Sequence, residues 1–120
     1  MSEAAKESIG RIEVAPEVLA TIAHYATLRV AGVSKMASIP ADAARLFRRA
    51  TKHNGVLLNH VDDKVSFDIY VIMDPHVNIM DTSQKLQTAV LESINTMVGI
   101  PVEAINVHVE DVIYVQGEAT

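Results

Sequence analysis

Residues 80–114 constrain the fold most, because they predict a helix, a stop and a strand in direct succession. The helical stripe that would be buried recurs at the i, i+3, i+4, i+7 spacing and consists of Leu86, Ala89, Val90, Ser93, Ile94 and Met97. Asp81 is predicted as the N-cap, with Gln84 as its capping-box partner three residues later. Gly99 provides the stop and Pro101 prevents the helix from resuming.

The strand after this helix is predicted by alternation. Ile105, Val107 and Val109 are separated by polar residues, which is the period of a strand with one buried face. A hairpin is predicted earlier, with arms Val56–Val61 and Lys64–Met73 around Asp62 and Asp63. Its second arm places Val65, Phe67, Ile69, Val71 and Met73 on one face and Ser66, Asp68 and Tyr70 on the other.

The first half of the chain adds three further elements. A helix is predicted from Pro16 to Gly32, a short strand over residues 33–37, and a second helix from Pro40 through Lys52. The short alternation over residues 10–14 is consistent with an edge strand or with an extended lead-in.

These elements predict an α+β domain. Without its first helix the order is β-α-β-β-α-β, a two-layer sandwich in which helices cover one face of a mainly antiparallel sheet of about four strands. The length of 120 residues suits one domain, predicted over residues 10–114 with flexible tails at 1–9 and 115–120. The expected core is Leu19, Ile22, Phe67, Ile69, Val71, Leu86, Val90, Ile94, Val107 and Val109.

Composition limits the classes of function. The chain has no cysteine, which excludes disulfides and thiolate metal sites, and no apolar run approaches the ~20 residues that span a bilayer. The polar N-terminus is not a signal peptide, so a cytoplasmic location is expected. The net charge of −5 argues against general binding of nucleic acid.

No catalytic or cofactor motif is present in the sequence. The five histidines lack metal-ligand spacing, and only a fold that gathers His60 and His108 with Asp68 would favour a metal site. There is no nucleophile elbow and no glycine-rich phosphate loop. We therefore expect a protein that is not an enzyme and that needs no cofactor.

The sharpest local feature is a group of cations. Arg45, Arg48, Arg49 and Lys52 are four of the ten Lys and Arg, and on the predicted helix they would form one row. Such a row could dock an acidic segment of a partner protein, anionic lipid head groups or RNA, or it could only complement the helix macrodipole. A different class of function, a small-ligand or RNA-binding regulator, would use the open sheet face around Tyr70 and His108.

Residues 87–112 read QTAVLESINTMVGIPVEAINVHVEDV and resemble the alkaline shock protein twenty-three family of bacterial envelope stress response proteins. The matching positions are Gln87, Val90, Met97, Gly99, Val102, Ile105, Asn106, Val107, Val109 and Val112. The opening GRIEVAPEVLATIA at residue 10, VAGV at residue 30 and KHNGV at residue 52 are also similar to the family pattern. Residues 73–79 depart from it, because the family usually has a Tyr-Gly pair there.

The resemblance implies a non-catalytic cytoplasmic scaffold or interaction module. Such proteins self-associate and can sit at the inner face of the membrane through a membrane-bound partner. Other relatives are linked to the regulation of lipid metabolism.

Overall fold

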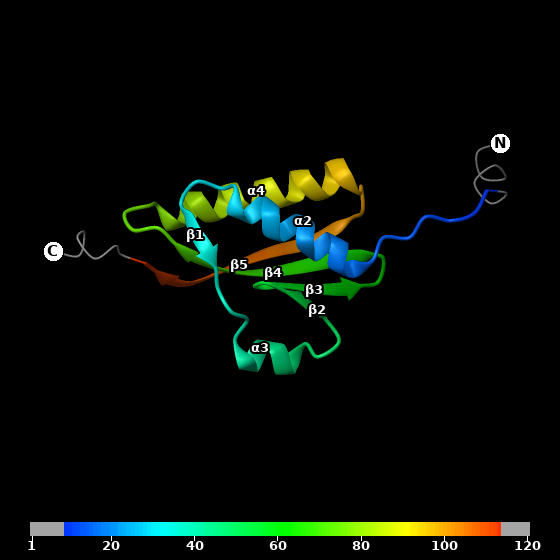
Figure 1. The fold of residues 1–120 in the computed structure, drawn as a ribbon, viewed down its shortest axis with the longest axis horizontal. Helices are drawn as coiled ribbons and strands as arrows, with labels where there is room; N and C mark the ends of the chain where they lie inside the picture. Colours follow the sequence, from blue (N-terminus) through cyan, green and yellow to red (C-terminus); the bar gives the residue numbers. More distant parts are fainter. Residues whose placement is uncertain (1–8, 114–120) are drawn as a thin grey trace.

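The computed structural model describes residues 9–113 and contains a five-stranded sheet with three helices (Figure 1). In chain order the elements are α2 (Pro16–Leu28), β1 (Val33–Met36), α3 (Ala41–Leu46), β2 (Thr51–His53), β3 (Val56–Val61), β4 (Lys64–Met73), α4 (Ile79–Met97) and β5 (Val102–Val112). The predicted tails at 1–9 and 115–120 lie outside the described residues, except for Ile9. Residues 10–15 form an extended lead-in and belong to no strand of the sheet.

Strand β4 is the centre of the sheet. One edge of β4 pairs in parallel with β5 along residues 65–73, and its other edge pairs antiparallel with β3 and then with β1. Strand β2 continues the sheet beyond β3. The prediction of an α+β fold with a mainly antiparallel sheet is confirmed. The fifth strand is β2, whose Thr51 and Lys52 were predicted as part of a helix.

Helices α2 and α4 cover one face of the sheet (Figure 1). The core between these layers is made of alternate residues of β4, such as Phe67, Ile69 and Val71, and of one side of each helix. Of the ten residues expected in the core, Ile22, Val107 and Val109 are only partly buried and the other seven are buried. The predicted orientation of β4 is confirmed, since Phe67 is fully buried while Asp68 is half-buried.

The third helix, α3, lies on the opposite face of the sheet, so the prediction that all helices share one face is wrong (Figure 1). The physical reason is that β4 is apolar on both faces in its C-terminal half. Tyr70 and Leu57 of the adjacent strand point away from α2 and α4 and must be covered. Ala43 and Phe47, at α3 and its end, pack on this second apolar cluster.

The predicted helix from Pro40 to Lys52 ends at Leu46. Thr51, Lys52 and His53 pair instead with β3, because the Asn54-Gly55 turn folds the chain back as a hairpin. Leu46, the last residue of α3, is 77% exposed. Tertiary pairing here overrides the helical periodicity.

Two details of α4 also differ from the prediction. The N-cap is Asn78, whose side-chain oxygen accepts from the backbone N–H of Asp81 at 2.9 Å. Asp81 therefore lies in the first turn, where its negative charge still complements the helix dipole. Met97 is exposed at the end of the helix and does not join the buried stripe of Leu86, Val90 and Ile94.

Candidate functional site

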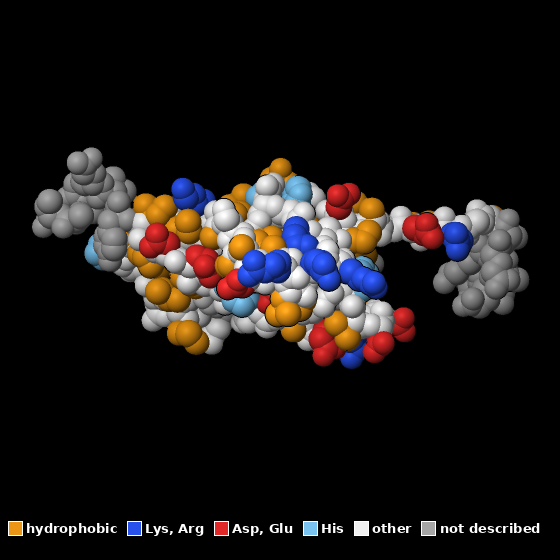
Figure 2. Space-filling view, turned by 90° about the horizontal axis from the view of Figure 1, so that it is seen from below, with side chains coloured by type: hydrophobic (Ala, Val, Ile, Leu, Met, Phe, Trp, Pro, Cys, Tyr) orange, Lys and Arg blue, Asp and Glu red, His pale blue; other side chains and the backbone are white. Residues whose placement is uncertain are grey.

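The four predicted cations do not form a row on one helix, because they lie on a helix, a turn and a strand. Arg45 is on α3, Arg48 and Arg49 are in the turn that follows, and Lys52 is on β2. Figure 2 views the molecule from the side of α3 and shows Lys and Arg side chains gathered in a band across this face. Arg48 and Arg49 line one hollow, and the Lys52 ammonium group lies at the Arg48 carbonyl, so these three cations are neighbours although they do not share a helix.

Two of these four cations are already engaged. Arg45 pairs with Asp42 one turn earlier on α3. Lys52 donates to the backbone carbonyls of Phe47, Arg48 and Ala50 at 2.9, 3.4 and 3.3 Å. These hydrogen bonds stabilise the turn between α3 and β2. Within residues 9–113, Arg48 and Arg49 have no side-chain hydrogen bond or ion pair.

Arg48 and Arg49 flank a shallow hollow of about 290 Å³. Its other walls are Leu46, Phe47, Ala50 and Asn59. Two unpaired guanidinium groups beside an exposed leucine make a surface that combines charge with apolar contact. We call Leu46, Arg48 and Arg49 the arginine patch.

A second polar group lies on the same side of the sheet, where β4 and β5 run in parallel. The register places Asp68 beside Asn106 and Tyr70 beside His108. His108 Nε2 lies 2.8 Å from Asp68 Oδ1, and the Asn106 amide donates to the same oxygen at 3.2 Å. Strand alternation predicted these residues on one face, and the structure shows that they form a connected cluster, the Asp68 cluster.

The side chains of the Asp68 cluster contact one another and leave little of Tyr70 exposed. The Tyr70 and His108 rings stack at 4.4 Å with an interplanar angle of 12°, and Tyr70 is only 5% exposed. Burial raises the pKa of Tyr70, and the charges of Asp68 and Glu110 raise it further. Stacking of a nucleic-acid base needs an exposed ring face, and the ring of Tyr70 is already covered.

The condition set for a metal site is met only in part. Asp68 and His108 come together, but His60 pairs across from Val65, whose side chain points to the other face of the sheet. Cross-strand partners point to the same side, so His60 lies away from Asp68. In the described part of the chain, no three His, Asp or Glu side chains gather closely enough to hold a metal ion.

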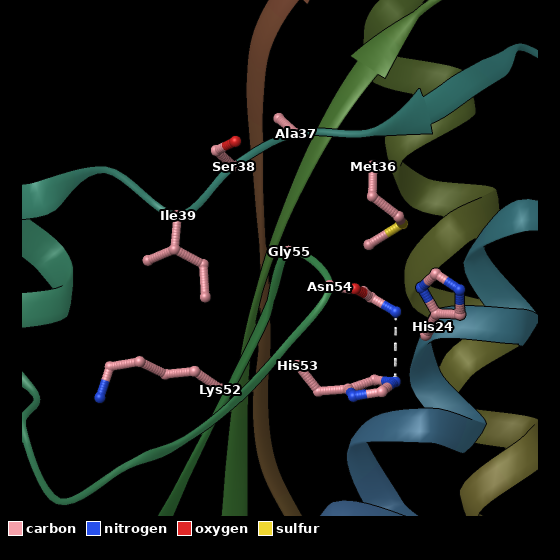
Figure 3. A pocket seen from close by; sticks show the side chains of 9 residues that line it. All are labelled: His24, Met36, Ala37, Ser38, Ile39, Lys52, His53, Asn54 and Gly55. Atoms are coloured by element: carbon pink, nitrogen blue, oxygen red, sulfur yellow. Dashed lines mark hydrogen bonds between the residues drawn. The ribbon is translucent and has the colours of Figure 1, made fainter.

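A third site was not predicted, and Figure 3 shows it. Segments far apart in the sequence line an open pocket of about 570 Å³, with His24 from α2, residues 36–39 after β1, and residues 52–55 of the β2–β3 hairpin. His24 Nδ1 is buried and has no hydrogen-bond partner, and the His24 and His53 rings meet edge to face at 5.7 Å. Asn54 reaches His53 Nε2 at 3.4 Å, and Lys52 points away from this group (Figure 3).

This pocket could accept a small polar ligand with a donor for an imidazole nitrogen. Of the residues that line this pocket, only Asn54 and Gly55 stood out in the sequence, as a turn signal. Nothing in the sequence indicated that His24, twenty-nine residues before His53, would face the same hollow.

Proteins of similar sequence point to one family. The model of the alkaline shock protein twenty-three family, described as having a cell envelope-related function, matches residues 4–114. The chain is 33% identical over 108 residues to Spy1535 of Streptococcus pyogenes, covering 89% of this chain and 82% of that protein. It is 26% identical over 115 residues to YloU of Bacillus subtilis, covering 93% and 96%.

The solved structures that match this chain resemble it in fold and have low sequence identity to it. The MamM CTD M250L variant superposes with a TM-score of 0.50 at 16% identity, covering 79% of this chain and 95% of that one. The zinc form of MamM CTD D249N gives 0.50 at 15% identity, covering 83% and 88%. Among residues 9–113, no helix combines the length and the apolar character needed to cross a membrane.

Proposed function

Because the chain belongs to the alkaline shock protein twenty-three family, whose cell envelope-related model matches residues 4–114, we propose that it is a non-catalytic interaction module of the envelope stress response. In this role it docks to a membrane-bound partner protein from the cytoplasmic side and associates with further copies of itself. The arginine patch is the surface that carries the docking.

The observation behind this assignment is the contrast between engaged and unengaged cations. Arg45 and Lys52 have intramolecular partners, whereas Arg48 and Arg49 expose their guanidinium groups beside Leu46. Arginine binds carboxylates with two parallel hydrogen bonds, and an exposed leucine gives such a contact an apolar centre. The patch fits a partner segment that has acidic residues next to an apolar one.

A protein partner fits better than nucleic acid. The net charge of −5 repels a long polyanion, and two adjacent arginines neutralise too few phosphates for stable binding at physiological salt. The aromatic ring on the open face of the sheet, Tyr70, is covered by His108. The surface chemistry therefore supports an acidic peptide segment.

The test is a double charge reversal, Arg48→Glu with Arg49→Glu. The protein is captured from lysed cells with the membrane fraction retained, and binding to anionic liposomes is measured at low and physiological salt. We expect the variant to lose a discrete membrane-protein partner while its thermal unfolding stays close to that of the parent.

The matched control is Arg29→Glu with Lys85→Glu, which makes the same change in net charge at the exposed C-cap of α2 and at an exposed position on α4. We expect this control to keep the partner. If the patch variant keeps its partner and folds normally, the patch is only a solvated surface and the docking assignment is wrong. Equal loss in both variants would point to net charge and not to the patch.

A second candidate is a small-ligand-binding regulator that uses the pocket around His24. The unpartnered Nδ1 of His24 favours it, because a buried polar atom without a partner costs about 1–3 kcal/mol and a ligand could remove that cost. A zinc ligand is not carried over from the zinc form of MamM CTD, because residues 9–113 offer no group of three ligands. Thermal shift with polar metabolites, compared between the parent and His24→Phe, tests this candidate, and equal shifts would reject it.

A further inference from the structure

The lead-in segment, residues 10–15, is extended, and its apolar side chains and that of the preceding Ile9 lie in solvent. Ile9 is 86% exposed and Ile12 is 96% exposed, and the segment runs away from the sheet (Figure 1). Ile12 and Val14 are two residues apart, so in an extended chain they point to the same side. Arg11 and Glu13 point to the other side and pair with each other at 3.5 Å.

Strand β5 has the opposite property, a long edge without a neighbour. It spans eleven residues, Val102–Val112, and within residues 9–113 it pairs only with β4. Its apolar side chains on the α4 side, including Val107 and Val109, remain only partly buried. An unpaired, apolar strand edge is a template for another strand.

The two features complement one another in polarity and charge. On β5 the apolar residues Val107 and Val109 alternate with His108 and with the exposed Glu110. On the lead-in segment Ile12 and Val14 alternate with Arg11 and Glu13 in the same period. Ile12 and Val14 would extend the apolar side, and Arg11 would come near Glu110 on the polar side.

We propose that the lead-in segment of a second copy of the chain adds as a strand to the free edge of β5. This inference rests on the self-association included in the proposed function, and it names the segment and the edge that would carry it. Backbone hydrogen bonds would supply affinity, and the alternation of side chains would fix the register. One edge acceptor, the Ile105 carbonyl, already receives a hydrogen bond from Gln87 at 2.9 Å, so the segment is placed beyond it. It would run from Val107 to Glu110, where the register of β5 with β4 shifts before Asp111.

The segment of the same chain is poorly placed for this role. Helix α2, which follows it, packs over β1, β2 and β3, whereas α4 packs over β5. Crossing from β3 to β5 covers two strand spacings, about 10 Å, and uses about three extended residues. Too little of the segment would remain to bring both Ile12 and Val14 alongside β5.

The first test measures molecular mass against concentration by sedimentation equilibrium. The parent is expected to assemble above the 13.0 kDa of one chain, and Ile12→Glu with Val14→Glu is expected to weaken assembly at least tenfold. Ile12 has almost no contact within its own chain, so circular dichroism should show an unchanged fold. The matched control, Met80→Glu with Met97→Glu, places the same charges at two exposed methionines of α4 and should assemble like the parent.

The second test uses the absence of cysteine from the chain. Arg11→Cys and Glu110→Cys chains are mixed under mild oxidation, and a disulfide between the two different chains is expected. Arg11→Cys mixed with Glu92→Cys, an exposed residue of α4, is the control and should cross-link much less. A chain that carries both Arg11→Cys and Glu110→Cys and closes an internal disulfide at high dilution would show that its own segment occupies the edge.

The outcomes separate this inference from the proposed function. If the Ile12→Glu, Val14→Glu variant assembles like the parent, the segment is not the occupant, and self-association through another surface stands. If the parent stays at one chain at every concentration, both the inference and the self-associating part of the proposed function are overturned. In that case docking through the arginine patch is still decided by its own variants.

Discussion

Replacing Gly55 by alanine should lower the free energy of unfolding more than the same change at Gly99, although both glycines have nearly the same backbone conformation. Their φ angles are +81° and +80°. A Cβ on Gly99 would meet nothing closer than the Asn95 carbonyl oxygen at 3.9 Å. A Cβ on Gly55 would lie 2.6 Å from the Ala37 carbonyl oxygen and 3.1 Å from that of Tyr70.

The magnitude follows from separating these contributions. An alanine in the left-handed region costs roughly 1–2 kcal/mol at either site. The loss of unfolded-chain entropy returns about 0.4–1 kcal/mol. Gly99→Ala should therefore destabilise by about 0–1.6 kcal/mol.

Gly55→Ala must in addition move the backbone. Ala37 N–H donates to the Tyr70 carbonyl at 2.8 Å and Tyr70 N–H donates to the Gly55 carbonyl at 2.9 Å, so the neighbours of the new Cβ are fixed by hydrogen bonds. Displacing them should add about 1–3 kcal/mol, the usual cost of overpacking. The expected difference between the two variants is therefore about 1–3 kcal/mol.

The assay is urea unfolding followed by far-ultraviolet circular dichroism, because the chain has no tryptophan to report by fluorescence. Each variant is compared with the parent at equal protein concentration and with unchanged m-value. If the two variants differ by less than about 0.5 kcal/mol, the neighbours of Gly55 can yield without cost and the close-approach argument is wrong.

Two further predictions test the core and the Asp68 cluster. Ile94→Ala should lower the free energy of unfolding by about 2–5 kcal/mol because Ile94 is fully buried. Leu91→Ala, on the exposed side of α4, should lower it by less than about 1 kcal/mol. Equal losses in urea unfolding would refute the assigned helix orientation. The pKa of Tyr70 is raised in the folded state, first by burial, so its contribution to stability is fully present below pH 10.0 and is lost as the pH rises through the folded pKa. The free energy of unfolding, measured from about pH 9 to 11, should fall more steeply for the parent than for Tyr70→Phe, and parallel slopes would contradict a raised pKa.

The elements that the sequence predicted well are those with a strong local signal. Strand β4 and residues 105–110 of β5 have a period of two, and α4 has a buried stripe at helical spacing. A capping residue is harder to choose, because Asn78 and Asp81 are both good N-caps. Asn78 has the extended backbone of an N-cap, with φ −80° and ψ 108°, whereas Asp81 is already helical, and sequence alone does not show this difference.

The features that the sequence could not predict depend on partners distant along the chain. Strand β2 forms only because β3 is available to pair with Thr51–His53. This pairing places Lys52 on a strand, so the four cations do not share one helix. Asp68 and His108 meet because β5 lies parallel to β4, forty residues away. The alternation placed both on the polar face, but only the register placed them in contact.

Gln87 shows how such a long-range contact explains a residue of the family pattern, and its replacement gives the last prediction. Its side-chain amide donates to the Ile105 carbonyl at 2.9 Å and so ties α4 to the edge strand β5. Gln87→Ala should cost about 0.5–1.5 kcal/mol and should speed hydrogen exchange of the β5 amides, because the edge loses a tether. Gln84→Ala, exposed one turn earlier with no hydrogen bond to β5 in the described residues, is the control and should stay within about 0.5 kcal/mol of the parent. If exchange along β5 is unchanged in Gln87→Ala, the glutamine does not hold this strand and its place in the family pattern needs another cause.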